Sequence, residues 1–137
     1  MNKDKKFDVI IVGGSYAGLS AAMALGRSLR KVLIIDAGNP CNKQTPHSHN
    51  FITQDGETPA AISEKAKAQV LEYPTVQFIQ DYAKSGKKIG DGFEIVTDSG
   101  HSFNGKKLIF ATGIKDVLPK IKGFAESWGI TAIHCPY

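Results

Sequence analysis

The feature that most constrains the fold is an apolar strand that runs directly into a glycine-rich turn. Residues 7–12 read FDVIIV, a β-branched run typical of a strand buried on both faces of a parallel sheet. The turn GGSYAG (13–18) follows, and a second apolar strand, KVLIID, occupies residues 31–36. Between them, apolar residues recur at helical spacing: Leu19, Ala22, Leu25 or Gly26, and Leu29. This order predicts a βαβ unit with a right-handed crossover.

The glycine turn lies where a phosphate-binding turn would be expected. Gly13 permits a tight turn, and Gly18 lets the helix pack closely on the strand. Backbone N–H groups between them can then approach a diphosphate at the positive end of the helix dipole. Ser15 stands where the usual second glycine would be, and its hydroxyl can donate a hydrogen bond to phosphate.

An acid at the end of the second strand supports the same prediction. Asp36 lies 36 − 18 = 18 residues beyond Gly18, close to the spacing of about twenty expected for an acid that binds ribose hydroxyls. Strand, turn, helix and acid together predict dinucleotide binding. The alternative is a purely structural turn in another α/β protein, with Asp36 an incidental acid.

The chain after Asp36 departs from simple strand–helix alternation. Residues 37–56 form an irregular loop, and Thr58-Pro59 opens a helix that is expected to end near Glu72. A short strand, 76–80, comes next. The segments AKSGKKIG, GFEIVT and HSFNGKKLIF, separated by GDG and DSG, predict a three-stranded antiparallel meander. A return strand (106–111), a connector and the start of a new strand (ITAIHC, 130–135) complete the prediction.

Composition narrows the class of protein. The chain has 137 residues, a net charge of +4 and a pI near 9.1, but its lysines are dispersed without interleaved aromatics, which argues against nucleic-acid binding. The apolar run at 7–12 is too short for a signal peptide or a membrane span. Two cysteines make no disulfide framework, so we expect a cytoplasmic protein. We predict no metal site, because His47 and His49 lack further ligands at zinc spacing.

These motifs resemble the thioredoxin-reductase-like family of FAD/NAD(P)-dependent pyridine nucleotide–disulfide oxidoreductases. The resemblance rests on IVGGSYAGLSAA, LIID, HSHNF, LIFATG and HCPY, and it covers the chain but only the amino-terminal part of a typical member. It implies an incomplete α/β, Rossmann-like FAD-binding domain containing the βαβ unit and the meander. Residues 1–117 would be the first segment of this domain. Residues 118–137 would be the crossover and start of an inserted NAD(P)H-binding domain.

The resemblance also implies roles for individual residues. The acid Asp36 would hold the adenosine ribose, Asn50 would lie near the flavin, and the backbone of Ala83 would meet the adenine. For Asn50, closure of a local Asx-turn is the alternative. The turn residues that would hold the FAD pyrophosphate are Gly13, Gly14, Ser15, Ala17 and Gly18, and those that would pass beside the cofactor are Ala111, Thr112 and Gly113.

The end of the chain carries the remaining implication. In the family a Cys-x-x-Cys motif stands where Cys135-Pro136-Tyr137 stands here, so Cys135 would be the substrate-facing thiol of a redox pair. The alternative is a small buried thiol; Cys41 is interpreted as an ordinary thiol. The parent would pass electrons from NAD(P)H through FAD to this pair and then to a thioredoxin-like protein or a small disulfide. The family also suggests a homodimer.

Other functions stay open from the sequence. A ferredoxin/flavodoxin–NADP reductase or a dithiol oxidase would share the fold, and a non-catalytic nucleotide-binding module would share the turn. Because the second cysteine would fall beyond Tyr137, we expect this 137-residue piece not to turn over.

Overall fold

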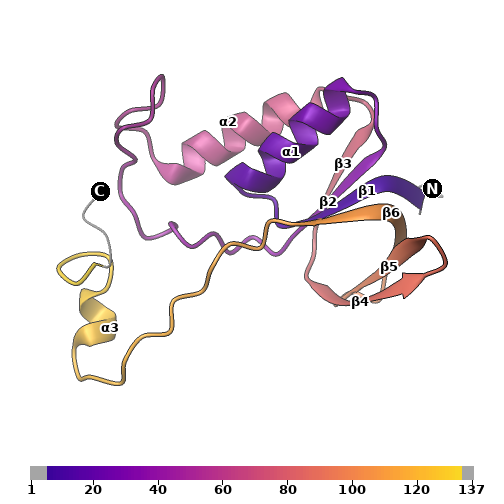
Figure 1. Cartoon of the computed structure of the whole chain (residues 1–137). Coiled ribbons are helices and arrows are strands. Elements are labelled where there is room, and N and C mark those ends of the chain that lie inside the picture. The colour runs from indigo at the N-terminus through magenta and orange to yellow at the C-terminus, as the bar shows by residue number, and fades with distance from the viewer. Residues whose placement is uncertain (1–5, 134–137) are drawn as a thin grey trace.

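A computed structural model describes residues 6–133, which form a six-stranded mixed sheet with two helices on one side (Figure 1). The strand order is β3-β2-β1-β6-β5-β4. The four strands β3, β2, β1 and β6 pair in parallel, whereas β6, β5 and β4 form an antiparallel meander. The strands are β1 (Lys6–Val12), β2 (Val32–Asp36), β3 (Val76–Gln80), β4 (Ala83–Ile89), β5 (Gly92–Thr97) and β6 (Ser102–Phe110).

Helices α1 (Tyr16–Arg27) and α2 (Pro59–Leu71) lie side by side over β1–β3 (Figure 1). The apolar cluster beneath them contains Val9, Ile11, Val32 and Ile34 of the sheet, packed with buried positions of both helices. At the start of α2, Thr58 Oγ1 accepts a hydrogen bond from Ala61 N at 3.2 Å. The capping prediction is confirmed.

The other side of the parallel strands is covered by the meander rather than by helices. Phe7 and Ile10 of β1 and Leu33 of β2 are buried against Ile95 and Phe103 of β5 and β6. Consecutive residues of β1 and β2 therefore face two separate apolar clusters. This arrangement explains why both strands read as continuous apolar runs instead of alternating ones.

The predicted βαβ unit and meander are confirmed, with two corrections. The spacing placed Leu29 on the buried face of the first helix, but α1 ends at Arg27, and Leu29 has φ 58° and is 77% exposed. The return strand predicted at 106–111 is not a separate element. It is the second half of β6, whose first half pairs with β5 while most of its length pairs with β1.

The segment after β6 leaves the sheet as an extended chain and reaches the short helix α3 (Phe124–Ser127) (Figure 1). The strand predicted for ITAIHC is wrong for residues 130–133. These residues form a turn, and Ala132 makes an isolated bridge to Trp128. Trp128 stacks on Phe124 with ring centroids 5.8 Å apart. Within residues 6–133, no helix is long and apolar enough to cross a bilayer.

Candidate cofactor-binding site

The candidate site lies at the carboxyl ends of three neighbouring parallel strands. In the sheet, β2 pairs with one edge of β1 and β6 with the other, and all three run in the same direction. Their ends bring Gly13, Asp36 and Ala111 to one edge of the sheet. In open α/β sheets, ligands bind outside this edge where the chain connections diverge to opposite sides.

Two glycines make the turn after β1 possible. Gly13 has φ 106°, a conformation that residues with side chains rarely adopt, and its N–H donates to Ile35 O at 2.8 Å. A Cβ on Gly13 would collide with the carbonyl oxygen of Ala111, and a Cβ on Gly18 would collide with the carbonyl oxygen of Gly13. Strand, turn and helix are therefore in backbone contact, as the glycine spacing predicts.

Gly14 has a role that the glycine pattern did not indicate. It is buried, and an added Cβ would lie 2.8 Å from Asp36 Cβ and 2.6 Å from Cε2 of Phe78. Its N–H donates to Asp36 Oδ1 at 2.8 Å, while Gly38 N donates to Asp36 Oδ2 at 3.0 Å. The carboxylate of Asp36 is thus fastened to the glycine turn, and each oxygen keeps a further lone pair for a ligand hydroxyl.

The start of α1 presents backbone donors to this edge of the sheet. Ser15 is the N-cap, its hydroxyl makes no capping hydrogen bond, and the first helical hydrogen bond runs from Leu19 N to Ser15 O at 2.8 Å. The amides of Tyr16, Ala17 and Gly18 therefore have no acceptor within the helix. Such donors, together with the helix dipole, favour an anion.

A hollow of about 940 Å³ connects most of the predicted adenosine-side residues. It is lined by Gly13, Asp36, Ala83, Thr112 and Gly113, which come from four separate stretches of the chain. Gly113 has φ 65°, and the space where its Cβ would be is open. A cofactor could therefore run close to the backbone at this point.

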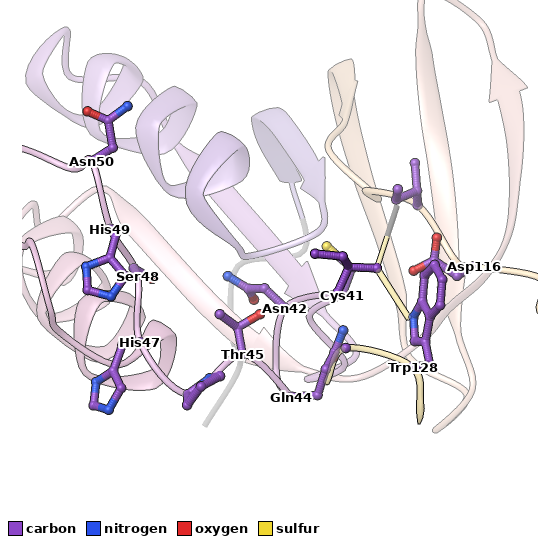
Figure 2. Close-up of a pocket in the computed structure, with 14 residues that line it drawn as sticks. Cys41, Asn42, Gln44, Thr45, His47, Ser48, His49, Asn50, Asp116 and Trp128 are labelled. Carbon is purple, nitrogen blue, oxygen red and sulfur yellow. The ribbon is translucent and has the colours of Figure 1, made fainter. Parts of the chain in front are cut away.

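The remaining predicted residues lie apart from that hollow. Ser15 lines an adjoining hollow of about 520 Å³, and Asn50 lines a third of about 710 Å³, where it lies at one end and Trp128 and Asp116 at the other (Figure 2). Each of the three hollows is lined in part by residues of the loop 39–50. Four further predicted residues line none of the three hollows: Gly14, Ala17, Gly18 and Ala111.

The loop around Asn50 is held by its own hydrogen bonds. Asn50 has φ 58°, and its N–H donates to Asp55 Oδ1 at 2.7 Å, so this position suits asparagine through its backbone. Its side chain closes no Asx-turn within the described residues. His47 Nδ1 lies 2.9 Å from Gly56 O, and His49 Nδ1 lies 3.6 Å from Asp55 Oδ1. Across residues 6–133, no three His, Cys, Asp or Glu side chains are grouped to hold a metal.

Asp81 fixes the corner between β3 and β4 beside the large hollow. Its N–H donates to Asp36 O at 2.9 Å, and its Oδ1 accepts from Tyr82 N at 2.8 Å. The neighbouring Thr97 hydroxyl lowers the pKa of Asp81, outweighing the opposite effect of burial, and Tyr82 N–H and Ser99 act in the same direction. No sequence pattern indicates this residue, because its partners come from β5 and the turn after it.

Comparison with known proteins decides the family. Residues 7–135 match the model of the pyridine nucleotide–disulphide oxidoreductases. The chain belongs to this family. Among pyridine nucleotide–disulphide oxidoreductases it is thioredoxin-reductase-like, and its fold is that of their FAD-binding, Rossmann-like domain.

Two curated relatives and one solved structure give the extent of the similarity. Thioredoxin reductase sirT of Leptosphaeria maculans is 38% identical over 132 residues, covering 94% of this chain and 40% of its own length. Thioredoxin reductase tcpT of Claviceps purpurea is 35% identical over 140 residues, covering 100% of this chain and 44% of its own length. The oxidoreductase from Agrobacterium tumefaciens superposes with a TM-score of 0.92 at 44% identity, covering 96% and 45%. The chain thus spans less than half the length of each of these proteins.

The predicted Cys135 lies outside the described residues.

Proposed function

We propose that this chain supplies the adenosine-diphosphate-binding part of the FAD site in a thioredoxin-reductase-like disulfide reductase. In this proposal, residues 1–117 are the first segment of the FAD domain, and residues 118–137 lead into a NAD(P)H-binding domain. The whole protein passes electrons from NAD(P)H through FAD to a Cys-x-x-Cys pair that includes Cys135, and on to a disulfide substrate. The family to which the chain belongs uses these two cofactors.

The observation that carries the proposal is the bond between the glycine turn and the strand-end acid. Gly14 N and Gly38 N both donate to the Asp36 carboxylate, which holds it beside the free amides that begin α1. A diphosphate needs donors and positive dipole ends, and the neighbouring ribose needs an acceptor for its hydroxyls. The chain offers these two chemistries side by side, in the order in which an ADP group requires them.

The residues present fit the cofactor in shape as well as in chemistry. Gly13 and Gly18 keep the turn tight, the Ser15 hydroxyl is free to donate, and the open backbone at Gly113 leaves room on the β6 side. When bound, FAD supplies the hydride and electron transfer that amino-acid side chains cannot perform. The role of the described residues is to bind and orient it; Asn50, at the third hollow, would lie toward the flavin end.

The proposal is tested by titrating the purified chain with ADP and with FAD in a calorimeter, comparing wild type with Asp36→Ala. We expect saturable binding by wild type and about tenfold or weaker binding by the variant, because a ribose acceptor is lost and the buried N–H of Gly14 is left unpaired. Asp91→Ala, at the exposed tip of the β4–β5 hairpin, is the matched control and should bind as wild type does. A folded wild-type chain that binds neither nucleotide would refute the proposal.

A further inference from the structure

The large hollow contains an exposed aromatic side chain that the family resemblance did not assign. Tyr82 lines it together with Asp36 and Ala83, and the residue is 60% exposed. Ligand pockets are lined predominantly by apolar and aromatic side chains, with a few polar groups that fix the orientation of the ligand. We propose that the ring of Tyr82 stacks on the purine base of the bound dinucleotide; this inference rests on the proposed function.

The backbone of Tyr82 is fixed although its side chain is free. Its N–H donates to Asp81 Oδ1 at 2.8 Å, and its carbonyl oxygen accepts from Asp98 N at 2.9 Å. The preceding residue, Asp81, donates its own N–H to Asp36 O at 2.9 Å. Tyr82 is therefore tied through the backbone to the residue proposed to hold the ribose, which keeps the Cα of Tyr82 close to the sugar and leaves the ring within reach of the base.

The ring itself has no partner among the described residues. Its hydroxyl makes no hydrogen bond, and it takes part in none of the aromatic pairs of the described chain, which involve Phe7, Tyr16, His101 and Phe124 with their neighbours. The other aromatic residue lining the hollow, Trp128, already stacks on Phe124. Tyr82 thus offers a free π-face on a backbone that is already ordered, so stacking has to restrict only the two side-chain torsions of the tyrosine.

In this proposal, different groups recognise the ribose and the base at this end of the site. The Asp36 carboxylate selects for the ribose hydroxyls, and the backbone of Ala83 is in position to meet polar atoms of the base. An aromatic face adds affinity for any planar base without reading its edge. We therefore expect Tyr82 to govern affinity for the purine end of the ligand rather than for the flavin end.

The test measures ADP binding to the full 137-residue chain, because ADP lacks the flavin and reports this end of the site alone. Tyr82→Ala and Tyr82→Leu should each bind ADP about tenfold or more weakly, whereas Tyr82→Phe should stay within about threefold of wild type. Ile89→Ala, which alters an exposed apolar residue on β4 outside the hollow, should change nothing. Circular dichroism identifies any variant that fails to fold, and the Leu and Phe variants keep the test decisive if Ala does.

The outcomes separate this inference from the proposed function. If wild type binds ADP and all three Tyr82 variants bind it equally well, the stacking role is refuted and the FAD site stands. If Tyr82→Leu binds ADP as tightly as Tyr82→Phe, the side chain contributes bulk rather than a stacking face, and the inference fails in that form. If wild type binds neither ADP nor FAD, the proposed function itself falls.

Discussion

At the scale of single residues, the turn after β1 depends on contacts that only glycine allows. Gly13 and Gly18 meet backbone oxygens at the positions where a Cβ would be, and backbone atoms cannot move aside as a flexible side chain can. Gly14 meets Phe78 and Asp36 instead, which brings its N–H to the carboxylate. Three positions of the turn thus depend on the absence of a side chain.

The substitution Gly18→Ala tests this contact directly. Alanine normally stabilises a helix by up to about 1 kcal/mol over glycine, but here its Cβ would collide with Gly13 O. We therefore expect the free energy of unfolding, measured by urea denaturation, to fall by about 1–3 kcal/mol. Ser20→Ala, on the exposed side of the same helix, should stay within about 0.5 kcal/mol of wild type. An unchanged or raised stability for Gly18→Ala would contradict the close packing of α1 on the turn.

The sequence predicted some of these residues and not others. The G-x-x-x-x-G spacing and the acid at position 36 follow a fixed pattern, so their geometry could be predicted. Phe78 and Tyr82 carry no such pattern, because what matters for them is the distance to residues far away in the chain. Leu29 shows the opposite error: its spacing matched the helix, but the helix ended two residues before it.

At the scale of elements, β6 joins the two parts of the sheet. Gly105 of β6 lies opposite Phe7 of β1 and also opposite Phe93 of β5, so one strand is both the third strand of the meander and the return strand. Sequence patterns divide segments at turns, and no turn lies within 102–110, so the pattern alone does not show that the third strand of the meander and the return strand are one strand. The corner after β3 is fixed in another way, through the Asp81 carboxylate.

The corner between β3 and β4 should make the free energy of unfolding depend on pH. The pKa of Asp81 is lowered in the folded chain, chiefly by the Thr97 hydroxyl, so its carboxylate contributes stability above its unfolded pKa. This contribution declines as the pH falls below about 5 and is lost once the pH has fallen through the folded pKa. The variants Asp81→Asn and Thr97→Val should each show a smaller loss of stability across that range than wild type, measured by thermal unfolding at a series of pH values. Equal slopes for all three proteins would show that the hydrogen bond does not couple to folding.

At the scale of the whole molecule, three stretches that are distant in sequence converge on one edge of the sheet. The turn at 13–18, the end of β2 and the chain after β6 meet because β1 lies between β2 and β6. This convergence could be predicted from the βαβ order and the return strand. The position of the segment 111–133 could not be predicted, since it leaves the sheet and returns to the loop at 39–50, where Gly129 and Gln44 line the same hollow.

The most direct test of the central claim, that the glycine turn and Asp36 together bind an ADP group, is residue-resolved NMR of the labelled chain during an ADP titration. We predict that the amide signals of Gly13–Gly18, Gly38 and Ala83 shift with a common saturation curve, while those at the hairpin tip around Asp91 stay in place. The account is contradicted if ADP binds but the amide signals of the turn stay unchanged. It is also contradicted if the folded chain does not bind ADP.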